Sequence, residues 1–157
     1  MSIGTVQGYN ARAGFMREAL SEARRAASYG DVPIGAVIVK DGRIIGRGAN
    51  RTELDGDPTM HAEVIAIRNA AAALASPRLE GCTMYVTVEP CTMCAGACVL
   101  SRLEAVYAGT DSPKSGAAGS VKEILNAPGL NHRLEYEVGL LKEECAAMLK
   151  EFFAALR

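Results

Sequence analysis

The sequence lacks any long run of apolar residues. None of its 157 residues belongs to an uninterrupted apolar stretch close to the roughly 20 residues that a membrane-spanning helix needs. The N-terminal stretch MSIGTVQGYNARAG also lacks the apolar core of a signal peptide. We therefore expect a single domain over residues 1–157, cytoplasmic and without membrane contact.

An excess of charge of one sign is also missing. The chain has 17 Lys and Arg against 18 Asp and Glu, which gives a formal net charge of −1. A strongly basic balance would have indicated nucleic-acid binding through overall charge. Any contact with an anionic partner must therefore depend on a local patch of cations.

The five cysteines do not have the pattern of a disulfide framework. Their number is odd, three of them are clustered, and no secretion signal precedes them. This distribution favours a metal site or buried thiols. Cys82 and Cys145 are predicted to be core thiols, and Cys145 lies on the apolar face of the last predicted helix.

The order of the predicted elements indicates a mixed α/β fold. Helical spacing of apolar residues predicts helices over residues 12–30, 61–75, 91–101 and from 141 onward. Runs of β-branched or alternating residues predict strands over 32–40, 43–51, 82–88, 103–109 and 134–138. Asp41–Gly42 turns the first two strands into a hairpin. Helices that alternate with strands after a hairpin imply a mixed sheet covered on both faces.

The stretch VEPCTMCAGACVL places Cys91 and Cys94 at the start of a predicted helix. Thiols three residues apart in the first turn point the same way, and the helix N-terminus favours their thiolate forms. Two thiolates make half of a tetrahedral zinc site, although CxxC also occurs in redox proteins and structural zinc sites. Cys98 shares their helix face, so it is either a fourth ligand that closes the site or a small buried residue.

The third ligand must come from elsewhere in a chain with only two histidines, His61 and His132. His61 opens a predicted helix and Glu63 follows two residues later. Residues two apart do not share a face of a regular helix, so both reach one site only if His61 lies at the helix start. Pro58 and a possible N-cap at Thr59 are consistent with that start. His132 is predicted to be structural.

One imidazole and two thiolates leave one position of a tetrahedral zinc ion open. Catalytic zinc sites keep that position for a water molecule, whose pKa falls to about 7. Glu63 is the candidate acid–base group, although a first-turn glutamate can also simply complement the helix dipole. The combination HAE and PCTMC fits the H-x-E…P-C-x-x-C signature of zinc-dependent nucleobase deaminases.

At these residues the sequence resembles the cytidine-deaminase-like superfamily and, within it, the bacterial tRNA adenosine deaminases. The resemblance runs from about Phe15 to Arg157 and is carried by DVPIGAVIV, GANR, DPTMHAEVIAI, YVTVEPCTMCAGA, PKSGAAGS, LNHRLE and EECAAMLKEFF. The last three are closest to the tRNA branch. The resemblance implies a three-layer α/β/α fold with a five-stranded mixed sheet, a homodimer, and one Zn²⁺ per subunit.

The resemblance also implies an activity, which is hydrolytic deamination of adenosine to inosine at the wobble position of a tRNA anticodon. His61, Cys91 and Cys94 would hold the zinc. Glu63 would take a proton from water and pass it to the adenine ring and then to departing ammonia, while C6 is attacked.

Five further residues are implied in substrate binding. Asn50 would hydrogen-bond the purine, unless it simply ends a strand, and the backbone of Ala62 would line the same pocket. Lys114, Phe153 and Arg157 match positions that contact the anticodon loop, where aromatic rings stack on bases and cations pair with phosphates.

One position departs from the family pattern, because Ser112 stands in SPK where related enzymes usually have DPK. A hydroxyl hydrogen-bonds a ribose more weakly than a carboxylate does, so the departure bears on RNA affinity or substrate choice. Two rival functions stay open. One is deamination of a free base or nucleoside, such as guanine or cytosine; the other is a structural zinc module with four protein ligands and no catalysis.

Overall fold

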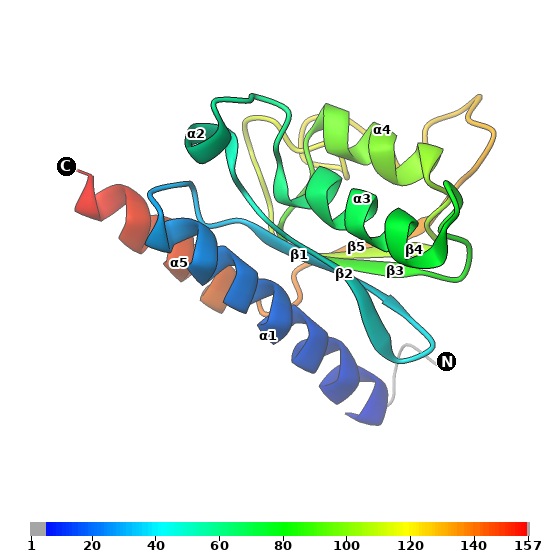
Figure 1. Ribbon diagram of the computed structural model, residues 1–157, viewed down its shortest axis with the longest axis horizontal. Helices are drawn as coiled ribbons and strands as arrows, with labels where there is room; N and C mark the ends of the chain where they lie inside the picture. Colours follow the sequence, from blue (N-terminus) through cyan, green and yellow to red (C-terminus); the bar gives the residue numbers. More distant parts are fainter. Residues whose placement is uncertain (1–5, 157) are drawn as a thin grey trace.

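A five-stranded sheet lies at the centre of the computed structural model, which describes residues 6–156 (Figure 1). In the order β2-β1-β3-β4-β5, the strands are Arg43–Ala49, Gly35–Lys40, Thr83–Val88, Ala105–Thr110 and Glu135–Val138. Strand β1 is antiparallel to β2 and to β3, whereas β3, β4 and β5 are mutually parallel. The predicted mixed sheet of five strands is confirmed.

Helices cover both faces of this sheet. Figure 1 shows α1 (Val6–Ser28) and α5 (Lys142–Ala155) on one face, and α3 (Ala62–Leu74) and α4 (Thr92–Leu100) on the other. Each face has its own apolar core, one of them around Ile38 and Met84 and the other around Met16 and Tyr85. The predicted three-layer α/β/α arrangement is therefore confirmed. No helix within residues 6–156 is long and apolar enough to cross a membrane.

Two features of the helices differ from the sequence prediction. Helix α1 begins earlier than predicted, and a short helix, α2 (Thr52–Asp55), was not predicted at all. Helix α2 forms because the buried Asp31 carboxylate accepts hydrogen bonds from the backbone N–H groups of Glu53 (2.9 Å) and Leu54 (3.0 Å). Unpaired N–H groups at a helix start need such acceptors, and here the acceptor is remote in sequence.

Glycines in β2 allow α3 to lie against the sheet. A Cβ atom on Gly48 would lie 2.1 Å from the carbonyl oxygen of Ala62 and 2.7 Å from the nitrogen of Ala66. A Cβ atom on Gly46 would lie 2.5 Å from the carbonyl oxygen of Ala66. Helix α3 therefore approaches the strand closely, and this contact sets the position of its first turn, next to His61 and Glu63.

We expect Gly48→Ala to reduce the free energy of unfolding by about 1–3 kcal/mol, because the added methyl group overpacks this contact. Urea denaturation measures the change. The matched control is Gly14→Ala in α1, where an added Cβ meets nothing within 4 Å. That control should stabilise the protein by about 0.5–1 kcal/mol, as alanine does in a helix. Equal effects of the two substitutions would contradict the packing argument.

Candidate active site

The predicted metal ligands meet where two helices begin at the same end of the sheet. His61 is the N-cap of α3, with extended backbone angles (φ −79°, ψ 150°), and Cys91 is the N-cap of α4, with φ −75° and ψ 178°. Cys94 lies in the first turn of α4. The helix α3 begins at Ala62, so His61 precedes the regular helix, as its proximity to Glu63 requires.

The cap itself differs from the prediction. Thr59 is not the N-cap of α3; its hydroxyl and its backbone N–H instead donate to the Asp57 carboxylate, at 2.7 and 2.9 Å. The backbone N–H of His61 donates to the carbonyl oxygen of Thr59 at 2.8 Å. This local turn directs the chain into α3 with His61 at the junction.

The donor atoms have the separations of a tetrahedral zinc site. His61 Nδ1 lies 3.6 Å from Cys91 Sγ and 3.4 Å from Cys94 Sγ, and all three atoms lie within 4.8 Å of one another. Zinc bonds of about 2.3 Å to sulfur and 2.0–2.1 Å to nitrogen imply a sulfur-to-nitrogen separation of about 3.5 Å at a tetrahedral angle. The three donors therefore fit Zn²⁺. In the described part of the chain they are the only cluster of at least three side chains that could hold a metal.

The electrostatics of the cluster favour a thiolate. A hydrogen bond from Cys94, helped by His61, lowers the pKa of Cys91 to about 3 despite partial burial. The same bond to Cys91, together with burial, raises the pKa of Cys94. The hydrogen bond with Cys91 also raises the pKa of His61. A thiolate is the form that binds metal, so binding would release the proton that remains on Cys94.

Glu63 is a carboxylate buried beside this cluster. It lies in the first turn of α3 and is 4% exposed. Burial raises its pKa, and the nearby Cys91 sulfur acts in the same direction, whereas its own backbone N–H and His61 oppose the shift. A carboxyl group that binds a proton more readily is suited to accept one and return it during a reaction.

Cys98 is not a fourth ligand. It is fully buried in the core, and its Sγ lies 3.9 Å from the sulfur of Met84. The structure therefore contradicts the closed, four-ligand alternative that the sequence left open. Cys82 and Cys145 are buried as predicted, and all five cysteines are free thiols.

Asn50 directly follows β2 and is 5% exposed. Its backbone N–H donates to the carbonyl oxygen of Ile34 and its carbonyl oxygen accepts from the Tyr29 hydroxyl, both at 3.0 Å. Its side-chain amide makes no hydrogen bond within residues 6–156, which leaves it available to a ligand. Ala62, fully buried, is the first residue of α3.

A hollow of about 320 Å³ opens next to Cys91. The start of α4 and the loop of residues 111–122 line it, with Cys91, Thr92, Met93, Lys114, Ser115, Val121 and Lys122. The structure therefore brings Lys114 to the site. The Ser112 hydroxyl is 3.1 Å from the hydroxyl of Ser115, which lines the hollow, so this departure from the family pattern lies next to its wall.

The remaining predicted contacts are not brought to this hollow. Phe153 lies on α5, 46% exposed, with its ring 5.4 Å from that of Phe152. Arg157 lies outside the described residues. His132 Nε2 is 2.7 Å from the carbonyl oxygen of Leu103, in agreement with its predicted structural role.

Sequence reasoning missed Glu89, a buried carboxylate two residues before Cys91. It accepts hydrogen bonds from the backbone N–H groups of Ser112, Ala118 and Ser120, and from the Ser120 hydroxyl. The signal that could have revealed it is an acidic residue directly after the apolar run of β3, in YVTVEPC. A charge at such a position is rarely buried unless it is paired.

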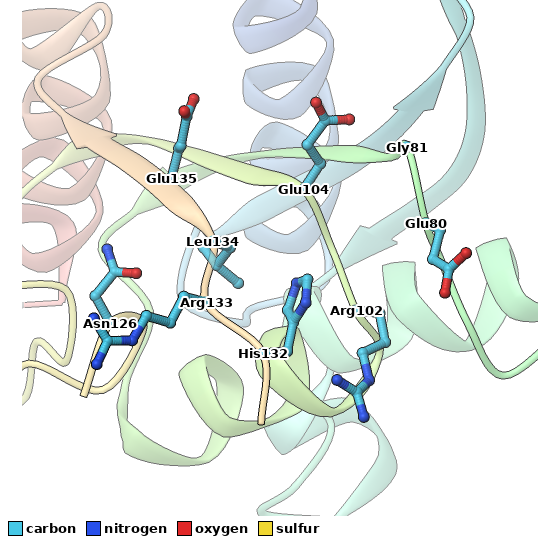
Figure 2. Close-up of a pocket in the computed structure, with 9 residues that line it drawn as sticks. All are labelled: Glu80, Gly81, Arg102, Glu104, Asn126, His132, Arg133, Leu134 and Glu135. Atoms are coloured by element: carbon cyan, nitrogen blue, oxygen red, sulfur yellow. The ribbon is translucent and has the colours of Figure 1, made fainter. Parts of the chain in front are cut away.

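A second hollow, of about 500 Å³, lies at the other end of the parallel strands (Figure 2). Glu104 precedes β4 and Glu135 begins β5, and Figure 2 shows both side chains pointing away from Arg102. The polar groups of this second hollow therefore do not converge on one point. Ligands of open α/β sheets bind outside the carboxyl ends of the strands, which is where His61 and Cys91 lie.

Comparison with known proteins agrees with this site. The sequence pattern of the MafB19-like deaminase family matches residues 10–157. The tRNA-specific adenosine deaminase of Bacillus subtilis (strain 168) is 48% identical over 143 residues, which cover 91% of this chain and 89% of that protein. The tRNA-specific adenosine deaminase of Aquifex aeolicus (strain VF5) is 49% identical over 143 residues, which cover 91% of this chain and 94% of that protein.

A solved structure from a study of A-to-I editing by tRNA:A34 deaminases at the wobble position of transfer RNA is also similar. It superposes with a TM-score of 0.83 at 46% identity, covering 87% of this chain and 99% of that chain. Both the extent and the level of identity are well above what a shared fold alone requires. The chain therefore belongs to the deaminase family that includes these tRNA-specific adenosine deaminases.

Proposed function

We propose that this protein catalyses the hydrolytic deamination of adenosine to inosine at the wobble position of a tRNA anticodon, with Zn²⁺ held by His61, Cys91 and Cys94. The observation that carries the proposal is the juxtaposition of these three donor atoms, within 4.8 Å of one another, beside the buried carboxyl group of Glu63. The 48% identity to a tRNA-specific adenosine deaminase supports the choice of substrate.

The donor set supports zinc as the metal. One imidazole nitrogen and two sulfurs form a borderline-soft set, which suits zinc. Three protein ligands correspond to a catalytic rather than a structural site, since structural sites have four. When bound, zinc supplies the acidified water that hydrolytic deamination consumes.

Glu63 moves the protons of the proposed reaction. Its carboxylate takes one proton from the attacking water and delivers it to the adenine ring nitrogen next to C6. It then takes the remaining proton of that water from the new hydroxyl on C6 and gives it to the amino group, which leaves as ammonia. Its burial keeps bulk water away from these transfers. Asn50 orients the purine through its free side-chain amide, and the backbone of Ala62, at the start of α3, lines the same pocket.

The RNA contacts combine cations and an aromatic ring. Lys114 lies in the wall of the hollow beside Cys91, where it would pair with a phosphate of the anticodon loop. Phe153 is an exposed ring on which a single-stranded base can stack, and Arg157 would add a further cation. The proposal includes a homodimer with one zinc per subunit, for which Leu100 on α4, 82% exposed, offers apolar surface.

A substrate panel tests this function. We expect the purified protein to form inosine in an anticodon stem-loop RNA with adenosine at the wobble position, with about one zinc per chain. The same stem-loop with guanosine at that position is the matched control. Free adenine, guanine, cytosine and their nucleosides complete the panel. Turnover of free bases without turnover of the stem-loop would contradict the proposal and favour the free-base alternative.

A further inference from the structure

We propose that Glu89 is a positioning residue that holds residues 111–122, here called the substrate loop, in the conformation that forms the hollow beside Cys91. The inference rests on the proposed function only for the identity of the substrate. Nothing in the proposed chemistry uses Glu89, and yet this ionisable residue is buried, at 3% exposure.

The carboxylate of Glu89 receives four hydrogen bonds from the substrate loop. Its Oε1 accepts from the backbone N–H of Ser112 (3.1 Å) and from the Ser120 hydroxyl. Its Oε2 accepts from the backbone N–H groups of Ala118 (2.9 Å) and Ser120 (3.0 Å). Hydrogen bonds to an ionised acceptor are stronger than neutral ones. Because the donors come from both ends of the loop, one side chain fixes its two arms together.

The middle of the substrate loop wraps around the same carboxylate. A Cβ atom on Gly116 would lie 2.4 Å from Cδ of Glu89 and 2.5 Å from each of its oxygens. Only a glycine therefore allows this approach. The next residue, Ala117, donates its backbone N–H to the carbonyl oxygen of Pro90 at 2.8 Å, which attaches the loop directly to the segment before Cys91.

The loop held in this way forms one wall of the hollow. Lys114 and Ser115 come from its first arm and Val121 and Lys122 from its second, and the rest of the lining comes from Cys91 and the start of α4. The position of Cys91 has separate support, because its carbonyl oxygen accepts the backbone N–H of Ala95 in α4 at 2.8 Å. The hydrogen bonds between Glu89 and the substrate loop are here called the anchor. Loss of the anchor should therefore deform the RNA-binding wall and leave the metal ligands in place.

Glu89→Gln tests the anchor. In glutamine, an NH₂ group replaces one of the two carboxylate oxygens. This group is a donor and cannot accept hydrogen bonds from the N–H groups that it then faces. We expect KM for the stem-loop RNA to rise about tenfold, with kcat and zinc content as in the wild type. Backbone amides of Ala118 and Ser120 should exchange hydrogen faster. The matched control is Glu123→Gln, because the Glu123 carboxylate is exposed and accepts a hydrogen bond from the Tyr136 hydroxyl.

A second variant keeps Glu89 intact. Gly116→Ala should displace the carboxylate and give the same increase in KM and in amide exchange, whereas Gly96→Ala, where an added Cβ meets nothing within 4 Å, should not. Simple destabilisation lowers the folded fraction, which reduces kcat and leaves KM unchanged. A lower kcat with an unchanged KM would overturn the inference, and so would a loss of zinc. Unchanged KM and unchanged amide exchange in both Glu89→Gln and Gly116→Ala would also overturn it. If the wild type does not act on the stem-loop, the proposed function fails, and amide exchange alone then decides on the anchor.

Discussion

Glu63→Gln should lower kcat for the stem-loop RNA by a factor of about 10²–10⁴ while the zinc content stays at the wild-type level. Glutamine has nearly the same shape as glutamate but cannot take up and return a proton. Because His61, Cys91 and Cys94 are untouched, the metal site should persist. Steady-state kinetics and metal analysis of the same preparation measure both quantities.

The control for this substitution is another first-turn glutamate. Glu53 is the second residue of α2, as Glu63 is of α3, and it is exposed. If Glu63 only complemented the helix dipole, Glu63→Gln and Glu53→Gln would act alike, each with a loss of about 0.3–1 kcal/mol of stability and an unchanged kcat. We expect only Glu63→Gln to abolish most turnover, because only Glu63 is buried next to the three donor atoms.

Cys91→Ala should abolish both zinc binding and turnover. The substitution leaves two protein ligands, and the loss of metal affinity should exceed the 10–100-fold that changes around a ligand typically cost. Metal analysis after purification, together with inosine formation, measures the result. Restoring zinc at millimolar concentration should restore little activity, since one corner of the site is lost.

Cys98→Ala is the matched control, because Cys98 lies on the same helix one turn beyond Cys94. Its sulfur contacts Met84 in the core, so we expect a modest loss of stability with zinc content and kcat unchanged. Zinc loss in Cys98→Ala would restore the four-ligand, structural alternative. Zinc retention in Cys91→Ala would show that the cluster of His61, Cys91 and Cys94 is not the metal site.

The layers of the fold follow from patterns that are local in the sequence. Apolar residues at helical spacing mark α3, and β-branched runs mark β1 and β3. The spacing of His61, Glu63, Cys91 and Cys94 was likewise sufficient to predict that these residues lie together, since His61 and Cys91 each stand at the start of a helix. Local periodicity also placed Cys98 on the face of the other two cysteines, but Cys98 lies one turn further along α4, where its sulfur contacts Met84 in the core.

The features that the sequence could not predict depend on partners remote in the chain. Helix α2 has no local side-chain cap, and its N–H groups bond to Asp31 instead. Glu89 gains its role only when residues 112–120 fold back onto it. Thr59 is a different, local case: it was a plausible N-cap by residue type, but its hydroxyl donates to the Asp57 carboxylate only two residues away. For α2 and Glu89, a hydrogen bond between residues far apart in the sequence decided the outcome, and local patterns carry no signal of it.

Anomalous diffraction at the zinc absorption edge, from crystals of the purified protein, would locate the metal. We expect one zinc peak in each subunit, bonded to His61 Nδ1 and to the sulfurs of Cys91 and Cys94, with no fourth side chain among its ligands and the Glu63 carboxylate next to the open position. A peak bound by four side chains, or a zinc ion located elsewhere in the chain, would contradict this expectation.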